Sequence, residues 1–116
     1  MRAFLTLAAT AIALAAALPA AAAPMGSQVV SGSFYHPRFE GRRTACGDRY
    51  DSGGYTAASN RHPCDALVRV SRGGKSVLVR VTDRCGRCGI DLTPAAAREI
   101  GLNRVGRAPV SVERVD

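Results

Sequence analysis

The chain has 116 residues, which is enough for one ordinary domain and too few for several. It carries 16 Lys and Arg against 9 Asp and Glu, a formal charge of +7, and it contains no Trp. A basic surface favours anionic partners, but neither a recognition helix nor a set of stacking aromatics accompanies the charge. We therefore do not expect nucleic acid as a partner.

The N-terminus has the pattern of a secretory signal peptide. Arg2 supplies a positive charge, residues 3–18 are apolar apart from two Thr, and residues 19–23 offer small residues for cleavage. The apolar run is shorter than the roughly 20 residues that a membrane-spanning helix prefers, and no Cys follows it to accept a lipid. We expect residues 1–23 to be removed and residues 24–116 to form one exported domain, periplasmic or extracellular, without a membrane anchor.

An exported protein meets the anionic polymers of the cell wall and the headgroups of lipids, so these are better candidates than nucleic acid for a partner of the basic surface. Alternatively, the positive charge is spread evenly over the surface and only keeps the protein soluble. We expect arginines to surround any groove that binds such a polymer.

The expected mature chain contains four cysteines: Cys46, Cys64, Cys85 and Cys88. An even number in a short exported chain predicts two disulfides, for which three pairings are possible. The spacing from Cys85 to Cys88 also suits a zinc knuckle, but Cys46 and Cys64 are too far apart to form a second one. A redox pair is the other alternative, but no βαβ pattern surrounds the motif. We expect disulfides, no metal and no cofactor.

Along the mature chain, short strands alternate with loops. β-Branched and aromatic residues predict a first strand at 29–35, a long loop rich in Gly, Arg and Asp follows at 36–52, and 55–58 is a short strand. Residues 66–71 and 76–82 alternate between apolar and polar side chains. Because Gly73 and Gly74 lie between them, these two runs predict a β-hairpin.

One helix and a final strand complete the chain. Residues 91–94 open the helix, in which Thr93 is the expected N-cap, Pro94 suits the first turn and Gly101 ends it. Residues 109–115 alternate again and predict a last strand. Five or six short strands with one helix indicate a mainly β fold, a small closed barrel.

Six fragments follow one another along the chain: 32–35 (GSFY), 41–48 (GRRTACGD), 56–58 (TAA), 79–84 (VRVTDR), 90–93 (IDLT) and 106–110 (GRAPV). In this order they resemble the double-psi β-barrel domain of the rare lipoprotein A (RlpA) family. The same fold occurs in expansins, barwin-like proteins and family 45 glycoside hydrolases, and the resemblance covers residues 29–115. It implies a six-stranded double-psi β-barrel with one short helix.

The resemblance to RlpA implies a lytic transglycosylase that acts on peptidoglycan, especially on strands stripped of peptides. Residues 82–88 are more similar to expansins and barwin-like proteins, which bind or loosen polysaccharide, often without cleaving it, or serve as inhibitors. The alternative is therefore a non-catalytic module that binds cell-wall polysaccharide. In either case we expect a monomer with peptidoglycan or another wall polysaccharide as partner.

Cleavage of a glycosidic bond needs a carboxyl group to protonate the leaving oxygen and a base for the incoming hydroxyl. Asp83 matches the family pattern and leaves a predicted strand just before a turn, so it is the first catalytic candidate; capping of that turn is its structural alternative. Asp48 is the second candidate, because it lies where RlpA proteins usually carry Glu.

Four further residues are expected to contact substrate. The resemblance to expansins implies this role for Asp91, and the RlpA fragments imply it for Tyr35 and Thr44. RlpA proteins typically have His where this chain has Ser59, whose hydroxyl is expected to bind substrate without moving protons. The even number of cysteines, together with the position of the matching cysteine in expansin-like domains, implies the pairing Cys46–Cys64 and Cys85–Cys88. We also expect Asp48 and Asp91 to line the same groove as Asp83.

Overall fold

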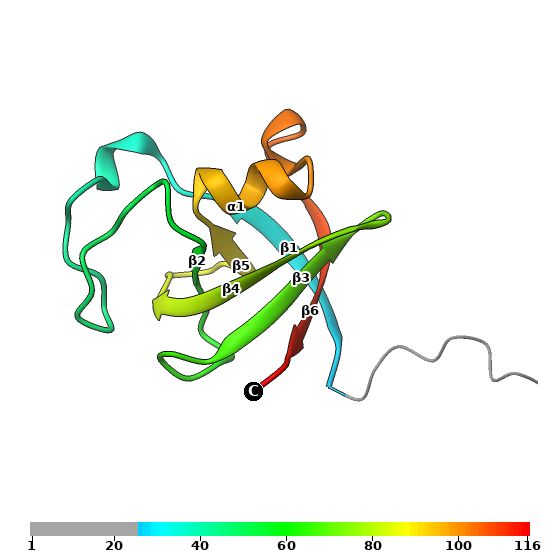
Figure 1. The fold of residues 1–116 in the computed structure, drawn as a ribbon, viewed down its shortest axis with the longest axis horizontal. Helices are drawn as coiled ribbons and strands as arrows, with labels where there is room; N and C mark the ends of the chain where they lie inside the picture. Colours follow the sequence, from blue (N-terminus) through cyan, green and yellow to red (C-terminus); the bar gives the residue numbers. More distant parts are fainter. Residues whose placement is uncertain (1–25) are drawn as a thin grey trace, which may run out of the picture.

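The computed structural model describes residues 26–116, so the expected signal peptide at 1–23 lies outside the described residues. Six strands close into a barrel in the order β1-β5-β2-β4-β3-β6, as predicted for this mainly β chain (Figure 1). The strands are β1 Gln28–Phe34, β2 Thr56–Ala58, β3 Leu67–Arg72, β4 Lys75–Asp83, β5 Ile90–Leu92 and β6 Ala108–Arg114.

The predicted hairpin is formed by β3 and β4, which pair antiparallel from Leu67 opposite Arg80 to Arg72 opposite Lys75. Gly73 in the turn has φ +55°, a backbone conformation that residues other than Gly rarely adopt. The alternating apolar residues of both strands point into the barrel, where they are at most 8% exposed: Val68, Val70, Val77, Val79 and Val81. Period-two alternation thus supplies one wall of the core.

The sequence pattern did not predict strand β5, because residues 91–92 were expected to open the helix. Ile90 and Leu92 are buried, and β5 pairs parallel with β1 and antiparallel with β2. A second parallel pair joins β2 to β4. At the start of β5 the chain passes so close to β1 that a Cβ on Gly89 would lie 2.4 Å from the backbone oxygen of Ser31.

The helix α1, Pro94–Glu99, covers one end of the barrel (Figure 1). As predicted, the Thr93 hydroxyl accepts a hydrogen bond from the Ala96 N–H and caps the helix. Ala96 and Ala97 are fully buried against the core. A 3-10 turn, η2 Leu102–Arg104, leads on to β6. Within residues 26–116, no helix is long and apolar enough to cross a membrane.

The predicted loop at 36–52 extends away from the barrel beside β2 (Figure 1). It contains a 3-10 turn, η1 Pro37–Phe39, and one isolated bridge between Arg43 and Arg49. Its apolar contacts form a second, smaller cluster in which Tyr35, Tyr50 and Ala58 are buried and Phe39 is half-buried. This cluster lies between the barrel and the loop, and it supports the candidate site.

Candidate functional site

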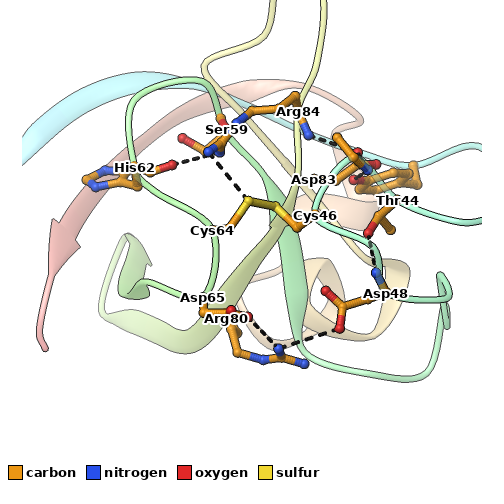
Figure 2. Close-up of a disulfide and its surroundings, with 12 residues drawn as sticks. Thr44, Cys46, Asp48, Ser59, His62, Cys64, Asp65, Arg80, Asp83 and Arg84 are labelled. Carbon is orange, nitrogen blue, oxygen red and sulfur yellow. Dashed lines mark hydrogen bonds and ion pairs between the residues drawn. A yellow bond between two sulfur atoms is a disulfide. The ribbon is translucent and has the colours of Figure 1, made fainter.

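Two disulfides lie near the end of β4, one between two loops and one within the loop that connects β4 to β5. Cys46 pairs with Cys64 and Cys85 pairs with Cys88, as the resemblance implied, with Cα atoms 5.8 and 5.7 Å apart. Figure 2 shows the Cys46–Cys64 bond beside Asp83, with Ser59 and His62 on the side of Cys64. This bond fixes the 36–52 loop to residues 59–65, which lie on the opposite side of the strand end.

The Asp83 carboxylate is held by three hydrogen bonds at the end of β4. Its Oδ1 atom accepts from the backbone N–H groups of Ala45 and Arg84, each at 2.8 Å. Its Oδ2 atom accepts from the Tyr35 hydroxyl, also at 2.8 Å. The donors are Tyr35 at the end of β1, Ala45 in the 36–52 loop and Arg84, the residue after Asp83. Three donors from different segments give the carboxylate one fixed orientation. Because Oδ2 accepts a single bond, it keeps more capacity to bind a ligand.

Three aromatic rings support this carboxylate. Tyr35 stacks on Tyr50 with ring centroids 4.4 Å apart and meets the edge of Phe39 at 5.8 Å. Burial raises the pKa of the Tyr35 phenol, and the hydrogen bond to Asp83 raises it further. Tyr35 therefore remains protonated at neutral pH and acts as a hydrogen-bond donor. Tyr50 and Phe39 were not among the predicted site residues, because only their aromatic character marks them in the sequence.

A hollow of about 300 Å³ opens beside Asp83. Its walls come from the end of β1, from the 36–52 loop and from the end of β4. It is lined by Tyr35, Phe39, Arg42, Arg43, Thr44, Tyr50, Asp83 and Arg84. Thus the structure brings three predicted residues, Asp83, Tyr35 and Thr44, together with three arginines, which agrees with the expected basic groove. Thr44 is 8% exposed, and its hydroxyl accepts from the Asp48 N–H.

Arg84 holds the segment that carries Ser59. Its guanidinium donates to the backbone oxygens of Ser59 and His62, both at 2.7 Å (Figure 2). Ser59 is only 1% exposed, and its hydroxyl accepts from the Arg61 N–H. The expected contact between Ser59 and substrate is therefore not supported by its position, because the hydroxyl lies beneath the surface. Burial lowers the pKa of His62, which remains neutral near pH 7.

Asp48 faces away from Asp83 (Figure 2). It lies in a neighbouring hollow of about 360 Å³, where its carboxylate is 3.8 Å from the Arg80 guanidinium. The two hollows flank the segment 44–50, since Thr44 and Tyr50 line one and Asp48 and Arg49 line the other. The expectation that Asp48 and Asp83 line one groove is therefore corrected to two adjacent hollows. The cause is the tight turn in which the Thr44 N–H donates to the backbone oxygen of Asp48 at 2.7 Å.

Asp91 lies on β5 and is not among the residues that line the first hollow. Its carboxylate accepts a hydrogen bond from the Ser33 hydroxyl at 3.1 Å. Burial raises the pKa of Asp91 above the ordinary value, and the negative charge of Asp83 adds to this, while the Ser33 bond and Arg107 oppose it. Asp91 therefore senses the charge of Asp83. Contrary to the prediction, Asp91 does not line the hollow.

No group of three or more His, Cys, Asp or Glu side chains within residues 26–116 is arranged to hold a metal ion. All four cysteines are used in disulfides. The first hollow presents an oriented carboxylate, phenol groups and guanidinium groups.

A family model described as lytic transglycolase matches residues 27–112. The chain belongs to this family. Over 94 residues it is 42% identical to the endolytic peptidoglycan transglycosylase RlpA of Neisseria meningitidis, covering 77% of this chain and 39% of that protein. It is 45% identical over 87 residues to an uncharacterized protein of Synechocystis, covering 73% of this chain and 96% of the other. The chain therefore spans about two fifths of the length of this RlpA relative.

Solved structures confirm that the fold is a double-psi β-barrel. The Streptomyces papain inhibitor superposes with a TM-score of 0.66 at 23% identity, over 78% of this chain and 94% of the inhibitor. A variant expansin of Clavibacter michiganensis in complex with cellohexaose superposes with a TM-score of 0.65 at 19% identity, over 78% of this chain and 50% of the expansin. At these identities the likeness concerns the fold alone.

Proposed function

We propose that this domain is an exported lytic transglycosylase that cleaves the glycan strands of peptidoglycan, with Asp83 as the residue that transfers protons. The observation that carries the proposal is the Asp83 carboxylate, oriented by three hydrogen bonds at the edge of an open hollow. Membership of the lytic transglycolase family supports it. The two disulfides favour a site of action outside the cytoplasm, where such bonds persist, and we propose a monomer there.

The reaction breaks the bond between C1 of one sugar and O4 of the next. Asp83, in its protonated form, donates its proton to the leaving O4. The resulting carboxylate then accepts the proton of the C6 hydroxyl on the sugar that carries C1. The C6 oxygen of that sugar forms the new bond to C1. One carboxyl group thus serves both steps, and the product is a 1,6-anhydro sugar formed without water. The fixed orientation of Asp83 keeps Oδ2 available at the position of both transfers.

The other predicted residues have supporting roles in this proposal. Tyr35 orients Asp83, and Thr44 forms the rim between the two hollows. A glycan strand that crosses the segment 44–50 would occupy both hollows, and Asp48 would then bind a neighbouring sugar from the second one. Asp91 lies outside the first hollow, and the charge of Asp83 helps to raise the pKa of its carboxyl group.

The test replaces Asp83 with Asn, which preserves the shape and removes the transferable proton. Each protein is incubated with peptide-free peptidoglycan strands, and 1,6-anhydro products are counted by mass spectrometry. We expect Asp83→Asn to release products at least about a hundredfold more slowly than the parent. Asp65→Asn is the matched control, because Asp65 is an exposed carboxylate paired with Arg80 outside the first hollow. Equal rates for Asp83→Asn and the parent would falsify the assignment.

A non-catalytic module that binds wall polysaccharide is the second candidate. The observation that favours it is Ser59, since this position offers no titratable group and its hydroxyl is buried. If neither the parent nor Asp83→Asn released product while both bound glycan strands, the binding module would be the better assignment. Measuring binding by co-sedimentation in the same experiment separates the two candidates.

A further inference from the structure

The arginines around the first hollow differ from those on the barrel in their partners. Among the described residues, ion pairs with Asp or Glu are made by Arg69, Arg80 and Arg114, which lie on strands β3, β4 and β6. None of the arginines that line the first hollow makes such a pair within residues 26–116. The guanidinium groups of these arginines are thus not paired with a carboxylate of the described residues, although Asp83 lines the same hollow.

The arginines of the hollow are not equivalent. Arg84 and Arg43 use part of their guanidinium groups to donate to backbone oxygens, Arg84 to Ser59 and His62 and Arg43 to Gly47. Arg42 makes no side-chain hydrogen bond in the described part of the chain. It is exposed, and its guanidinium carbon lies 5.8 Å from the centre of the Phe39 ring. The ring therefore restrains Arg42 while its N–H donors remain available to a ligand.

The position of Arg42 relative to the catalytic candidate follows from the aromatic contacts. Phe39 meets the edge of Tyr35, and the Tyr35 hydroxyl donates to Asp83. Arg38 reinforces the charge, since its guanidinium carbon lies 5.1 Å from the centre of the same Phe39 ring. A ligand held between Arg42 and Asp83 would therefore contact both a cation and the proton-transferring group within one small hollow.

We propose that Arg42, with Arg43 beside it, binds a carboxylate carried directly on a sugar of the substrate, which in a peptidoglycan strand is the lactyl carboxylate of muramic acid. This inference rests on the proposed function. The hydroxyl and acetamide groups of the glycan are neutral, so the lactyl group is the substituent whose charge suits a guanidinium fork. When the lactyl carboxylate is coupled to an amine, its charge is lost. Arg42 and Arg43 would therefore favour strands whose lactyl carboxylate is free over strands in which it is coupled.

The experiment uses peptide-free strands and the same strands after their lactyl carboxylates have been converted to methylamides. Dissociation constants and product release are measured for the parent, Arg42→Gln and Arg42→Lys. Arg104→Gln is the matched control, because it removes one charge from an exposed arginine that lines none of the hollows described. We expect the parent and the control to bind the carboxylate strands roughly fivefold to tenfold more tightly than the methylamide strands.

Arg42→Gln should lose most of this preference, and Arg42→Lys should keep part of it because the charge remains without the planar fork. Equal binding of both strands by the parent, or an unchanged preference in Arg42→Gln, would overturn the inference. The result is independent of catalysis. A parent that prefers carboxylate strands but releases no anhydro product contradicts the proposed function alone, whereas one that binds and cleaves both strands equally contradicts the inference alone.

Discussion

The barrel and the side of the domain formed by the loops 36–52, 59–65 and 84–89, here called the loop side, are held together in different ways. The barrel core consists of aliphatic side chains from all six strands and from α1, and most of them are nearly inaccessible to solvent. The loop side has a much smaller apolar cluster around Tyr35 and Tyr50, and it depends on disulfides and on hydrogen bonds to Asp83 and from Arg84. Apolar burial is non-directional, whereas hydrogen bonds and disulfides specify individual atoms. The candidate site therefore lies where single groups decide the geometry.

The largest expected effect of a single substitution lies in the barrel, at Gly89. Its Cβ in Gly89→Ala would lie 2.4 Å from the Ser31 oxygen and 2.7 Å from the Ser31 nitrogen, both backbone atoms that cannot move aside without separating β1 from β5. We expect the free energy of unfolding to fall by about 3 kcal/mol or more. Urea unfolding followed by circular dichroism measures it.

Gly86 provides the control within the same loop, because a Cβ added there meets nothing within 4 Å. Gly86→Ala should leave the unfolding curve nearly unchanged. Similar losses for the two variants would mean that the close passage of β1 and β5 does not determine barrel stability.

The next effect concerns the connection between the two regions. Replacement of both Cys46 and Cys64 with Ser removes a bond across 18 residues, and we expect a loss of about 3 kcal/mol from the greater entropy of the unfolded chain. Product release should fall as well, because Ala45, next to Cys46, donates to Asp83. Chemical unfolding and mass spectrometry of the products measure both effects.

The Cys85–Cys88 pair is the comparison for this prediction, since it closes a separation of only 3 residues. Replacing that pair with Ser should cost less stability than replacing the first. If the order were reversed, the short loop beside Asp83 would contribute more to the loop side than the bond between the two loops.

A smaller effect is expected from Tyr35→Phe, which removes the hydroxyl that donates to Asp83 Oδ2 and keeps the ring that stacks on Tyr50. We expect a loss of about 1 kcal/mol in stability and a reduction of roughly tenfold in product release, because Asp83 then has one less restraint. Tyr55→Phe is the matched comparison, since it removes a hydroxyl that donates to Glu99 beside the second hollow and leaves the hydrogen bonds of Asp83 intact. Equal losses of activity in the two variants would contradict the role of Tyr35.

These regions also differ in how well the sequence predicts them. The β3–β4 hairpin and the α1 cap depend on neighbours in the chain, so alternation, Gly73 and Thr93 were sufficient to predict them. Strand β5 has only three residues and pairs with β1 through Gly32 opposite Ile90, a contact that no local pattern indicates. Long-range pairing therefore explains why this strand was mistaken for the start of the helix.

On the loop side, the sequence indicated Asp83 as a candidate because it combines a strand end with a family fragment, and the structure places its carboxylate at the first hollow. It did not predict that Asp48 turns towards Arg80 or that Ser59 is buried, since both depend on backbone turns between distant segments. Tyr50 was missed for the same reason, because its importance comes from stacking on Tyr35. Residue identity thus indicated the chemistry, while the loop conformation determines which side chains meet.

The smallest effect is a dependence of stability on pH that connects the two regions through Asp91, which lies on a barrel strand and faces the loop side. Because burial raises its pKa in the folded state, the folded protein binds more protons than the unfolded chain at pH values between the ordinary and the raised pKa. The contribution of Asp91 to stability is then complete below the ordinary pKa of Asp and is lost as the pH rises through the raised value. In Asp91→Asn the amide oxygen can still accept from Ser33, and this pH-dependent loss should disappear. Urea unfolding from pH 3 to pH 7 should show the stability of the variant gaining on that of the parent as the pH increases. Parallel curves for the two proteins would mean that burial of Asp91 does not disfavour its charge.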